Sequence, residues 1–511
     1  MLPDASLLQS LQDQLGRDLL AFAPELFLAT AIVFILFARL FSFLDSVHRV
    51  TTGITVVFAA LGLLLMQWDT ATEGITHGNA FSGLLVFDTF ALWFRTFILL
   101  ATLIVLLLSR GTGLPDHDDS GDFTVMLLGS ALGLMLMSSA NHLLIVFLAI
   151  EMASLPSYAL SGFLKGRLTG SEAALKYVIF GAASGGIMLY GISLLTARVG
   201  TGYLPALAKT LGVSVAHGGF DFHLMAGLLF LGVGLGYKLS VVPMHVWLPD
   251  VFEGAAAEVG AYLSVASKAA AVALLGRLLE ITYSISPDHA YVVNSLGLPL
   301  AVIGAITATY GNLMAYAQTN LNRLLGYSTI AHAGFLLAGL ATITKAGTTA
   351  TLVYLNAYLF ANLAAFAVVA AVRVRTGRED VNALKGLVKE SPLLGIGFAL
   401  AVMSLLGLPP LAGFAGKFLI FESLFESARG EWSSVWWSVF ALLLVNTAVS
   451  AGYYLKLIRL VGLEDAETPA ERNEVFGLRV LVVVLSLASV LFGVLWSPLL
   501  KVAAMAVGSL R

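Results

Sequence analysis

The stretch FILLATLIVLLLS, residues Phe97–Ser109, decides the fold class of this chain. Polar and apolar residues do not alternate along it, and only one threonine and the final serine interrupt its apolar side chains. A strand of a membrane β-barrel alternates between lipid-facing and lumen-facing residues over about 10 residues, so this stretch excludes such a strand. A helix that crosses the hydrocarbon core needs about 20 apolar residues, and this stretch supplies most of one.

The composition extends this interpretation to the whole chain of 511 residues. Hydrophobic residues make up 58% and charged residues 12%, and the mean hydropathy is +0.90. Apolar stretches recur between short polar breaks, so we predict an all-α polytopic membrane protein with the lipid bilayer as a partner. The net charge of −3 comes without a basic patch, so we expect no nucleic acid partner. Because the chain has no cysteine, it cannot supply thiolate ligands to an iron–sulfur cluster.

We expect about 14 transmembrane helices. Their predicted ranges are 21–42, 48–67, 83–109, 122–139, 141–163, 173–198, 224–245, 256–280, 291–316, 322–343, 348–372, 391–425, 433–460 and 476–510. Most of the loops between them are too short to hold a folded domain.

Lysine and arginine fall unevenly on the two sides of these spans. When the N-terminus is placed outside, the inner loops hold most of them, between Arg49 and Arg479. The outer loops hold Arg198, Lys209, Lys345 and Arg429. Since cytoplasmic loops of membrane proteins are enriched in Lys and Arg, both termini are predicted to lie on the outer face.

Several ionisable residues lie inside the predicted spans. A charge near the bilayer centre costs at least about 2.5–3.5 kcal/mol, so such residues normally face protein or water and are functional candidates. The candidates are Glu151, Lys176, Lys238, Lys268, His332 and Lys417.

A structural role is the alternative for each of these residues. Lys176 starts its helix, and Glu172 lies one turn earlier, so a local salt bridge is expected there. His332 follows Tyr327, Ser328 and Thr329, and is either a satisfied core histidine or part of a relay. Asp88 and Arg95 share one face of the third span, and we interpret them as a structural pair.

The three deep lysines are harder to explain as structural. Lys238, Lys268 and Lys417 lie too deep to reach the membrane surface easily. Glu151 is the only carboxylate that we expect at comparable depth, so pairing cannot satisfy all three. Burial favours the neutral form of a lysine and a nearby carboxylate favours its charged form, which is the behaviour that a proton relay needs.

Two of the spans carry helix breakers beside a deep lysine. Pro243 follows Lys238, and Pro409 and Pro410 precede Lys417. Proline removes a backbone donor and breaks or kinks a helix. Interrupted helices in corresponding positions of two halves indicate an ion pathway in repeat-built transporters, whereas an ordinary proline kink is the alternative.

This arrangement predicts two inverted five-helix repeats with broken helices 7 and 12. The first repeat covers helices 4–8 in residues 121–281, and the second covers helices 9–13 in residues 282–462. Helices 1–3 precede them in residues 1–120, and helix 14 follows in residues 463–511. An odd number of helices per repeat gives the two repeats opposite topology.

Four motifs between about residues 120 and 460 resemble one family in order and content. They are AALKYVIFGAASGGIMLYG, GYKLSVVPMHVWLPDVFEGA, NRLLGYSTIAHAGF and GLPPLAGFAGKF. They resemble the antiporter-like membrane subunits of respiratory NADH-quinone oxidoreductase (complex I), whose superfamily includes cation/proton antiporter and membrane hydrogenase subunits. Lys417 stands where subunit M is expected to carry glutamate, and Lys268 where subunit L is expected to carry histidine. Tyr237 and Met244 depart from the usual phenylalanines without removing an ionisable group.

The resemblance implies roles for the candidate residues. It makes Glu151 and Lys238 an ion pair of the fifth and seventh spans, Lys268 the central relay, and Lys417 the terminal proton donor or acceptor. Lys176 and His332 are implied as accessory members of the same network.

The resemblance also implies the molecular setting of a translocase in a bacterial inner membrane. The NADH-oxidising chemistry, with FMN, iron–sulfur clusters and quinone, belongs to partner subunits, and this chain itself holds no cofactor or metal. The implied membrane partners are subunit M, the small subunits K and J, and the lateral helix of subunit L. A subunit of a cation/proton antiporter or of a membrane hydrogenase, and a structural scaffold with buried charges, remain the alternatives.

Overall fold

The computed structural model describes residues 5–41, 47, 49–72, 78–115, 119–164, 166–216, 219–286, 289–430, 432–466 and 476–510. Nearly all of this part is helical, which confirms the all-α fold class. The one sheet within these ranges is an antiparallel hairpin of β1 (Gly78–Ala80) and β2 (Leu85–Phe87).

The first half of the chain contains the helices α1 to α12, with the first helix break after α9. They are α1 (Ala5–Ala21), α2 (Ala23–Ala38), α3 (Val50–Thr72), α4 (Thr89–Thr112), α5 (Ser120–Ser139), α6 (Leu143–Ser161), α7 (Leu168–Val199), α8 (Leu204–Ala216), α9 (Phe222–Leu239), α10 (Leu248–Gly254), α11 (Ala257–Tyr262) and α12 (Lys268–Ile285). A π-helical turn, Leu263–Ser267, joins α11 to α12.

The helices of the second half contain the second helix break. They are α13 (His289–Val292), α14 (Leu298–Ala315), α15 (Leu321–Ala341), α16 (Lys345–Thr376), α17 (Leu387–Glu390), α18 (Pro392–Leu406), α19 (Ala412–Ser427), α20 (Ser433–Leu463), α21 (Phe476–Val494) and α22 (Ser497–Gly508). A second π-helical turn, Val293–Gly297, and a 3₁₀ turn, Val381–Leu384, complete the set.

The predicted spans fall on these helices. Among the described residues, twelve helical segments are long and apolar enough to cross a membrane, and α1 with α2 makes a thirteenth if this pair, bent by 71°, is one span. The predicted span 391–425 is divided between α18 and α19, each too short to cross alone. The predicted single span 476–510 is also two helices, because a proline in the first turn of α22 starts a new helix.

Both predicted helix breaks are present. The helix α9 ends at Leu239, and Ser240 adopts the left-handed conformation before the segment that contains Pro243. The helix α18 ends at Leu406, and Gly407 adopts a φ of 92° before Pro409 and Pro410. Proline cannot donate the next helical hydrogen bond, so each helix stops and leaves backbone carbonyls free.

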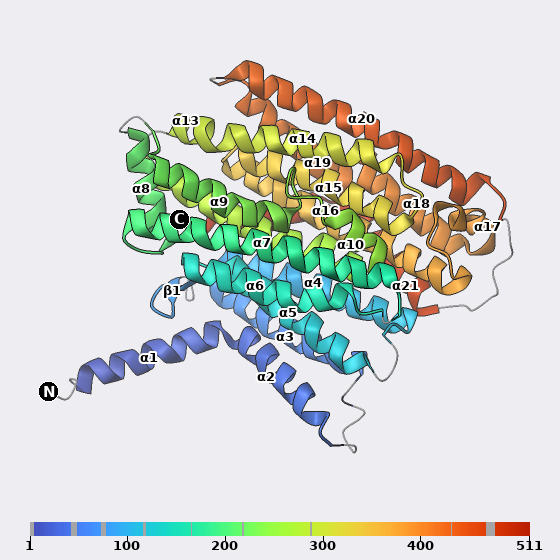
Figure 1. Ribbon diagram of the computed structural model, residues 1–511, viewed down its shortest axis with the longest axis horizontal. Coiled ribbons are helices and arrows are strands. Elements are labelled where there is room, and N and C mark those ends of the chain that lie inside the picture. The colour runs from blue at the N-terminus through green and yellow to red at the C-terminus, as the bar shows by residue number, and fades with distance from the viewer. Residues whose placement is uncertain are drawn as a thin grey trace.

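Contacts between distant segments identify which helices lie at each end of the bundle. At the end that carries β1, β2 and α8, here called the hairpin end, Phe81 N donates to Asp18 at 2.8 Å and Phe90 N donates to Ser509 Oγ at 3.0 Å. These contacts place α1 and the end of α22 at the same end of the bundle. Figure 1 shows α8 and α13 towards the left and α17 at the opposite end, here called the α17 end.

Three helical segments form the centre of the bundle. The most apolar windows of Ala257–Ile285 and Leu321–Ala341 are 100% buried, and that of Lys345–Thr376 is 89% buried. The corresponding windows of α3, α20 and α21 are only 28% buried, so these helices lie at the periphery. In Figure 1, α15 and α16 lie between α14 and α20 on one side and α4 to α7 on the other. Charges on the central segments therefore face protein and not lipid.

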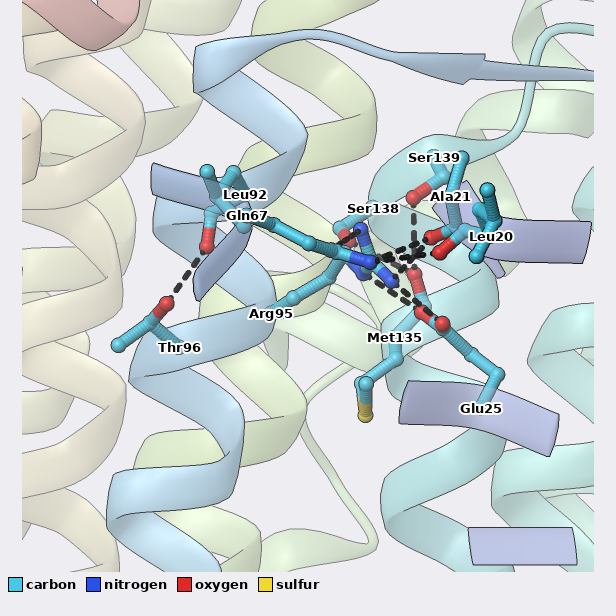
Figure 2. A network of polar contacts seen from close by, with 10 residues as sticks. All are labelled: Leu20, Ala21, Glu25, Gln67, Leu92, Arg95, Thr96, Met135, Ser138 and Ser139. Carbon is cyan, nitrogen blue, oxygen red and sulfur yellow. Dashed lines mark hydrogen bonds and ion pairs between the residues drawn. The ribbon is translucent and has the colours of Figure 1, made fainter. Parts of the chain in front are cut away.

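A buried charge network holds the bend between α1 and α2 (Figure 2). Arg95 of α4 pairs with Glu25 of α2, with Nε 2.6 Å from Oε1, and both side chains are buried. Arg95 also donates to Ala21 O at 3.1 Å, and Gln67 of α3 donates to Leu20 O at 2.9 Å. These donors satisfy the carbonyls that become free where α1 ends.

The predicted pair of Asp88 with Arg95 is wrong. Asp88 precedes α4 and caps it, because Ala91 N donates to Asp88 Oδ1 at 2.7 Å. The carboxylate pairs instead with Arg277 of α12, at 2.7 Å and 3.0 Å. Each residue has a structural partner, but from a segment far away in the sequence.

Candidate functional site

Lys268 lies at the centre of the bundle and binds the end of a broken helix. It begins α12 directly after the π-helical turn, a distortion that is common at functional sites. Its Nζ donates a hydrogen bond of 2.6 Å to the carbonyl oxygen of Leu239, the last residue of α9. The C-terminus of a helix carries partial negative charge, so this position attracts a cation.

Lys417 makes the corresponding contact at the second break. Its Nζ donates to Leu405 O at 3.1 Å and to Leu406 O at 3.0 Å, at the end of α18. The ammonium group also lies 4.8 Å from the centroid of the Phe335 ring. A Cβ atom at Gly407 would lie 3.0 Å from the Lys417 side chain, so the glycine makes room for the lysine.

Glu151 and Lys238 lie on α6 and α9. Lys238 is only 3% exposed, and Glu151 is half-buried with its Oε1 2.6 Å from where a Cβ atom of Gly185 would lie. The two charges are near enough to interact electrostatically. Among the described residues, however, neither forms a salt bridge. In this state the implied ion pair is a longer-range interaction and not a direct contact.

His332 of α15 is buried and interacts electrostatically with both Lys268 and Lys417. Its Nδ1 is 2.5 Å from the hydroxyl of Tyr354, and its Nε2 is 3.1 Å from the hydroxyl of Tyr454. The Tyr454 hydroxyl also forms a hydrogen bond of 2.5 Å with Ser328 Oγ. Both ring nitrogens therefore have a hydroxyl partner, and a neutral imidazole can accept a proton at one nitrogen and donate one from the other.

The tyrosines around His332 are functional candidates that the sequence analysis missed. Tyr354 and Tyr358 lie one turn apart on α16, and Tyr358 donates to Thr329 Oγ1 at 3.0 Å. Nearby, Asn362 donates to Ser264 Oγ at 2.6 Å. Tyrosine is frequent in membrane helices, so its presence in an apolar span gave no signal. The helical spacing of Tyr354, Tyr358 and Asn362 could have revealed one polar face.

The structure places Lys176 apart from the other candidates. Its Nζ forms the expected salt bridge with Glu172 at 2.6 Å and a second with Asp250 at 2.6 Å. Asp250 in turn accepts from Arg323 at 2.8 Å. The Lys176 side chain is 36% exposed. It therefore belongs to a surface group of ion pairs at the α17 end.

Glu151 is not the only buried carboxylate in the described part of the chain. Glu25, Asp88 and Glu258 are all buried, and Glu258 pairs with Arg373 at 2.9 Å. These three carboxylates pair with arginines, which leaves the lysines without them. Within the described ranges Lys238, Lys268 and Lys417 form no salt bridge, so none of them is in direct contact with a carboxylate.

The site is thus a group of buried lysines, a histidine and tyrosine hydroxyls in the middle of the helix bundle. The sequence of the chain was compared with those of known protein families. The family described as NADH:quinone oxidoreductase/Mrp antiporter, TM, matches residues 140–446. This chain belongs to that family.

The relatives and solved structures narrow the comparison. The chain is 37% identical over 510 residues to NADH-quinone oxidoreductase subunit N of Anaeromyxobacter, covering 96% of this chain and 97% of the relative. A chain of respiratory complex I from Thermus thermophilus has 34% identity and a TM-score of 0.75, covering 94% of this chain and 99% of that one. A chain of the Mrp complex from Dietzia has 22% identity and a TM-score of 0.80, covering 97% of each, which shows the shared fold.

Proposed function

We propose that protons cross the membrane through this chain along Glu151, Lys238, Lys268, His332 and Lys417, in the subunit N position of an NADH-quinone oxidoreductase. One observation carries the proposal: the two central lysines donate hydrogen bonds to carbonyl oxygens at helix breaks, and His332, which interacts electrostatically with both, has a hydroxyl partner at each ring nitrogen. The membership of the chain in a proton-translocating family and its subunit N relatives support it.

The Glu151–Lys238 distance provides the switch in this proposal. Two unit charges at about 4 Å attract by roughly 4 kcal/mol at an effective dielectric constant near 20. Moving one charge against 100 mV costs about 2.3 kcal/mol. Closing the pair is therefore enough to hold a proton on Lys238, and opening it releases that proton towards Lys268. The energy for this movement comes from the redox reaction in partner subunits.

The partners and location belong to the same proposal. FMN, iron–sulfur clusters and quinone lie in partner subunits, and subunits M, K and J and the lateral helix of subunit L contact this chain in the bilayer. The membrane is the bacterial inner membrane, with both termini on the outer face. Two features support this orientation: α1 and the end of α22 share the hairpin end, and Arg167, Arg375 and Lys389 gather at the α17 end.

The inverted repeats are also part of the proposal, with residues 121–281 and 282–462 as the two units. The similar contacts at the two breaks support them, since a lysine binds the last carbonyls of a broken helix in each. There is one asymmetry. Lys238 precedes its break, whereas Lys417 follows its own.

A cation/proton antiporter subunit is the second candidate, because the matching family includes Mrp antiporters and the fold is shared with an Mrp chain. Proton transfer along Lys238, Lys268 and Lys417 is compatible with either function. Purified complex in vesicles distinguishes them: NADH-driven proton movement that is independent of sodium and potassium supports the redox pump. Proton movement that requires one of these cations and ignores quinone supports the antiporter.

Lys238→Ala tests the proton path itself. In an assembled complex, the variant is expected to slow NADH-driven proton movement and coupled quinone reduction together. Proton pumping at the unmodified rate in that variant would refute the role of Lys238.

A further inference from the structure

Glu280 is a buried carboxylate that the pathway described above does not use. It lies on α12, the helix that begins with Lys268, and is 6% exposed. Its Oε1 accepts a hydrogen bond of 2.9 Å from Thr348 Oγ1 of α16. The nearest arginine along its own helix, Arg277, is already paired with Asp88. In the described part of the chain Glu280 forms no salt bridge, so it can bind a proton without first breaking an ion pair.

A stripe of hydroxyl groups on α16 leads from His332 to this carboxylate. Tyr354, Thr351 and Thr348 follow one another at spacings of three residues and lie on one side of α16, and Thr344 caps the start of the helix. Tyr354 contacts His332 at one end of the stripe, and Thr348 contacts Glu280 towards the other. Thr351 and Thr348 are both buried. From Tyr354 to Thr348 the helix rises by about 9 Å.

Two glycines leave room for the hydroxyl of Thr351, in the stripe, and for that of Thr342, just before α16. A Cβ atom at Gly339 of α15 would lie 2.4 Å from Thr351 Oγ1. A Cβ atom at Gly347 would lie 1.9 Å from Thr342 Oγ1. Any larger residue at either position would displace a hydroxyl from this region.

The stripe runs towards the hairpin end. Lys345, the first residue of α16, lies within electrostatic range of Glu280. Between Lys268 and Glu280, by contrast, the same face of α12 carries Val272 and Gly276, which cannot pass a proton. The side chains of α16 therefore provide a polar connection between His332 and Glu280.

We propose that Glu280 is the proton-carrying group through which protons leave the His332 region towards the hairpin end. Thr351, Thr348 and intervening water molecules form the connecting chain. The Glu280 carboxylate accepts a proton from the Thr348 hydroxyl, which regains one from water on the Thr351 side. The resulting carboxylic acid then releases its proton to water at the hairpin end, so that all groups return to their initial states. This inference rests on the lysine pathway proposed above.

The alternative is a structural hydrogen bond that only fixes α12 against α16. Side-chain replacements in the assembled complex separate the two, with NADH-driven proton uptake measured in inside-out vesicles. Glu280→Gln keeps the size and an acceptor for Thr348 but cannot carry a proton, and should lower the rate by about tenfold. Glu280→Asp keeps a carboxylate and should retain at least half of the rate. Thr282→Val, which removes a buried hydroxyl bonded to Leu278 O on the same helix, is the matched control and should leave the rate unchanged.

Two results would overturn the inference: a normal rate in Glu280→Gln, or equal losses in Glu280→Gln and Glu280→Asp. If Glu280→Gln does not assemble, Thr348→Val and Thr351→Val decide, because normal rates in both would remove the connecting chain. Lys268→Ala in the same assay separates this inference from the pathway on which it rests. Loss in Lys268→Ala with a normal Glu280→Gln refutes only the exit route, whereas a normal Lys268→Ala refutes the pathway.

Discussion

Lys268 donates a hydrogen bond of 2.6 Å to the carbonyl oxygen of Leu239, 29 residues earlier in the chain. The acceptor is free because α9 stops at Leu239, and α9 stops because Pro243 prevents its continuation. The helix break and the buried lysine thus form one structural unit, in which the break exposes the carbonyl that Lys268 binds. The break supplies negative partial charge inside the membrane, and the lysine uses it in place of a carboxylate.

Replacing Lys268 by methionine should remove the hydrogen bond to Leu239 O and the proton-carrying group together. The variant keeps the length and packing of the side chain but leaves Leu239 O without a donor, which costs about 1–3 kcal/mol. We expect the complex to assemble and NADH-driven proton movement to fall by about tenfold or more. Proton uptake and quinone reduction measured on the same vesicles check this, and normal proton uptake would show that Lys268 is not on the route.

The two tyrosines beside His332 should act together. In Tyr354→Phe one ring nitrogen of His332 loses its hydroxyl partner, and in Tyr454→Phe the other does. We expect a severalfold loss of proton movement in each variant and little further loss in the double variant, because either change interrupts the same chain. Losses that multiply in the double variant would indicate two independent routes. Tyr190→Phe, on the exposed face of α7, is the control.

The Arg95–Glu25 pair should matter for stability and not for transport. Removing one partner of a buried ion pair costs about 3–5 kcal/mol, because the other charge stays buried without compensation. Arg95→Met should therefore lower the yield of assembled complex and its unfolding midpoint. Combining Arg95→Met with Glu25→Met should recover part of the loss. A single variant with normal yield and midpoint would contradict the role of the pair at the α1–α2 bend.

Lys176 should be dispensable for proton transfer. It is part of a solvent-accessible group with Glu172 and Asp250, and exposed ion pairs contribute only about 0–1 kcal/mol. Lys176→Ala is expected to assemble and to pump at more than half of the unmodified rate. A loss as large as that of Lys268→Met would place Lys176 on the proton route, as its resemblance to the family motif implies.

The sequence was sufficient for the fold because membrane helices are encoded locally. Stretches such as Phe97–Ser109 predict spans by length and hydropathy alone, and prolines predict the breaks at Leu239 and Leu406. The bend between α1 and α2 was not predictable in the same way. It depends on Arg95 and Gln67, which reach the free carbonyls from two other helices.

The sequence predicted the charged members of the site better than their neighbours. A lysine in an apolar span stands out, whereas Tyr354, Tyr454 and Glu280 become meaningful only through contacts between helices. The same reason explains the wrong pairing of Asp88 with Arg95. The spacing of Asp88 and Arg95 indicated that they share one face of a helix. It could not show that Asp88 contacts Arg277, or that Arg95 contacts Glu25.

The most direct test of the central claim compares Lys417→Ala with Lys417→Arg in inside-out vesicles of assembled complex. Arginine keeps a positive charge and donors for Leu405 O and Leu406 O, but it does not lose its proton in proteins. If Lys417 carries protons, both variants lose NADH-driven proton uptake. If Lys417→Arg pumps at the unmodified rate while Lys417→Ala does not, the lysine serves only as a fixed charge, and the proposed pathway is contradicted.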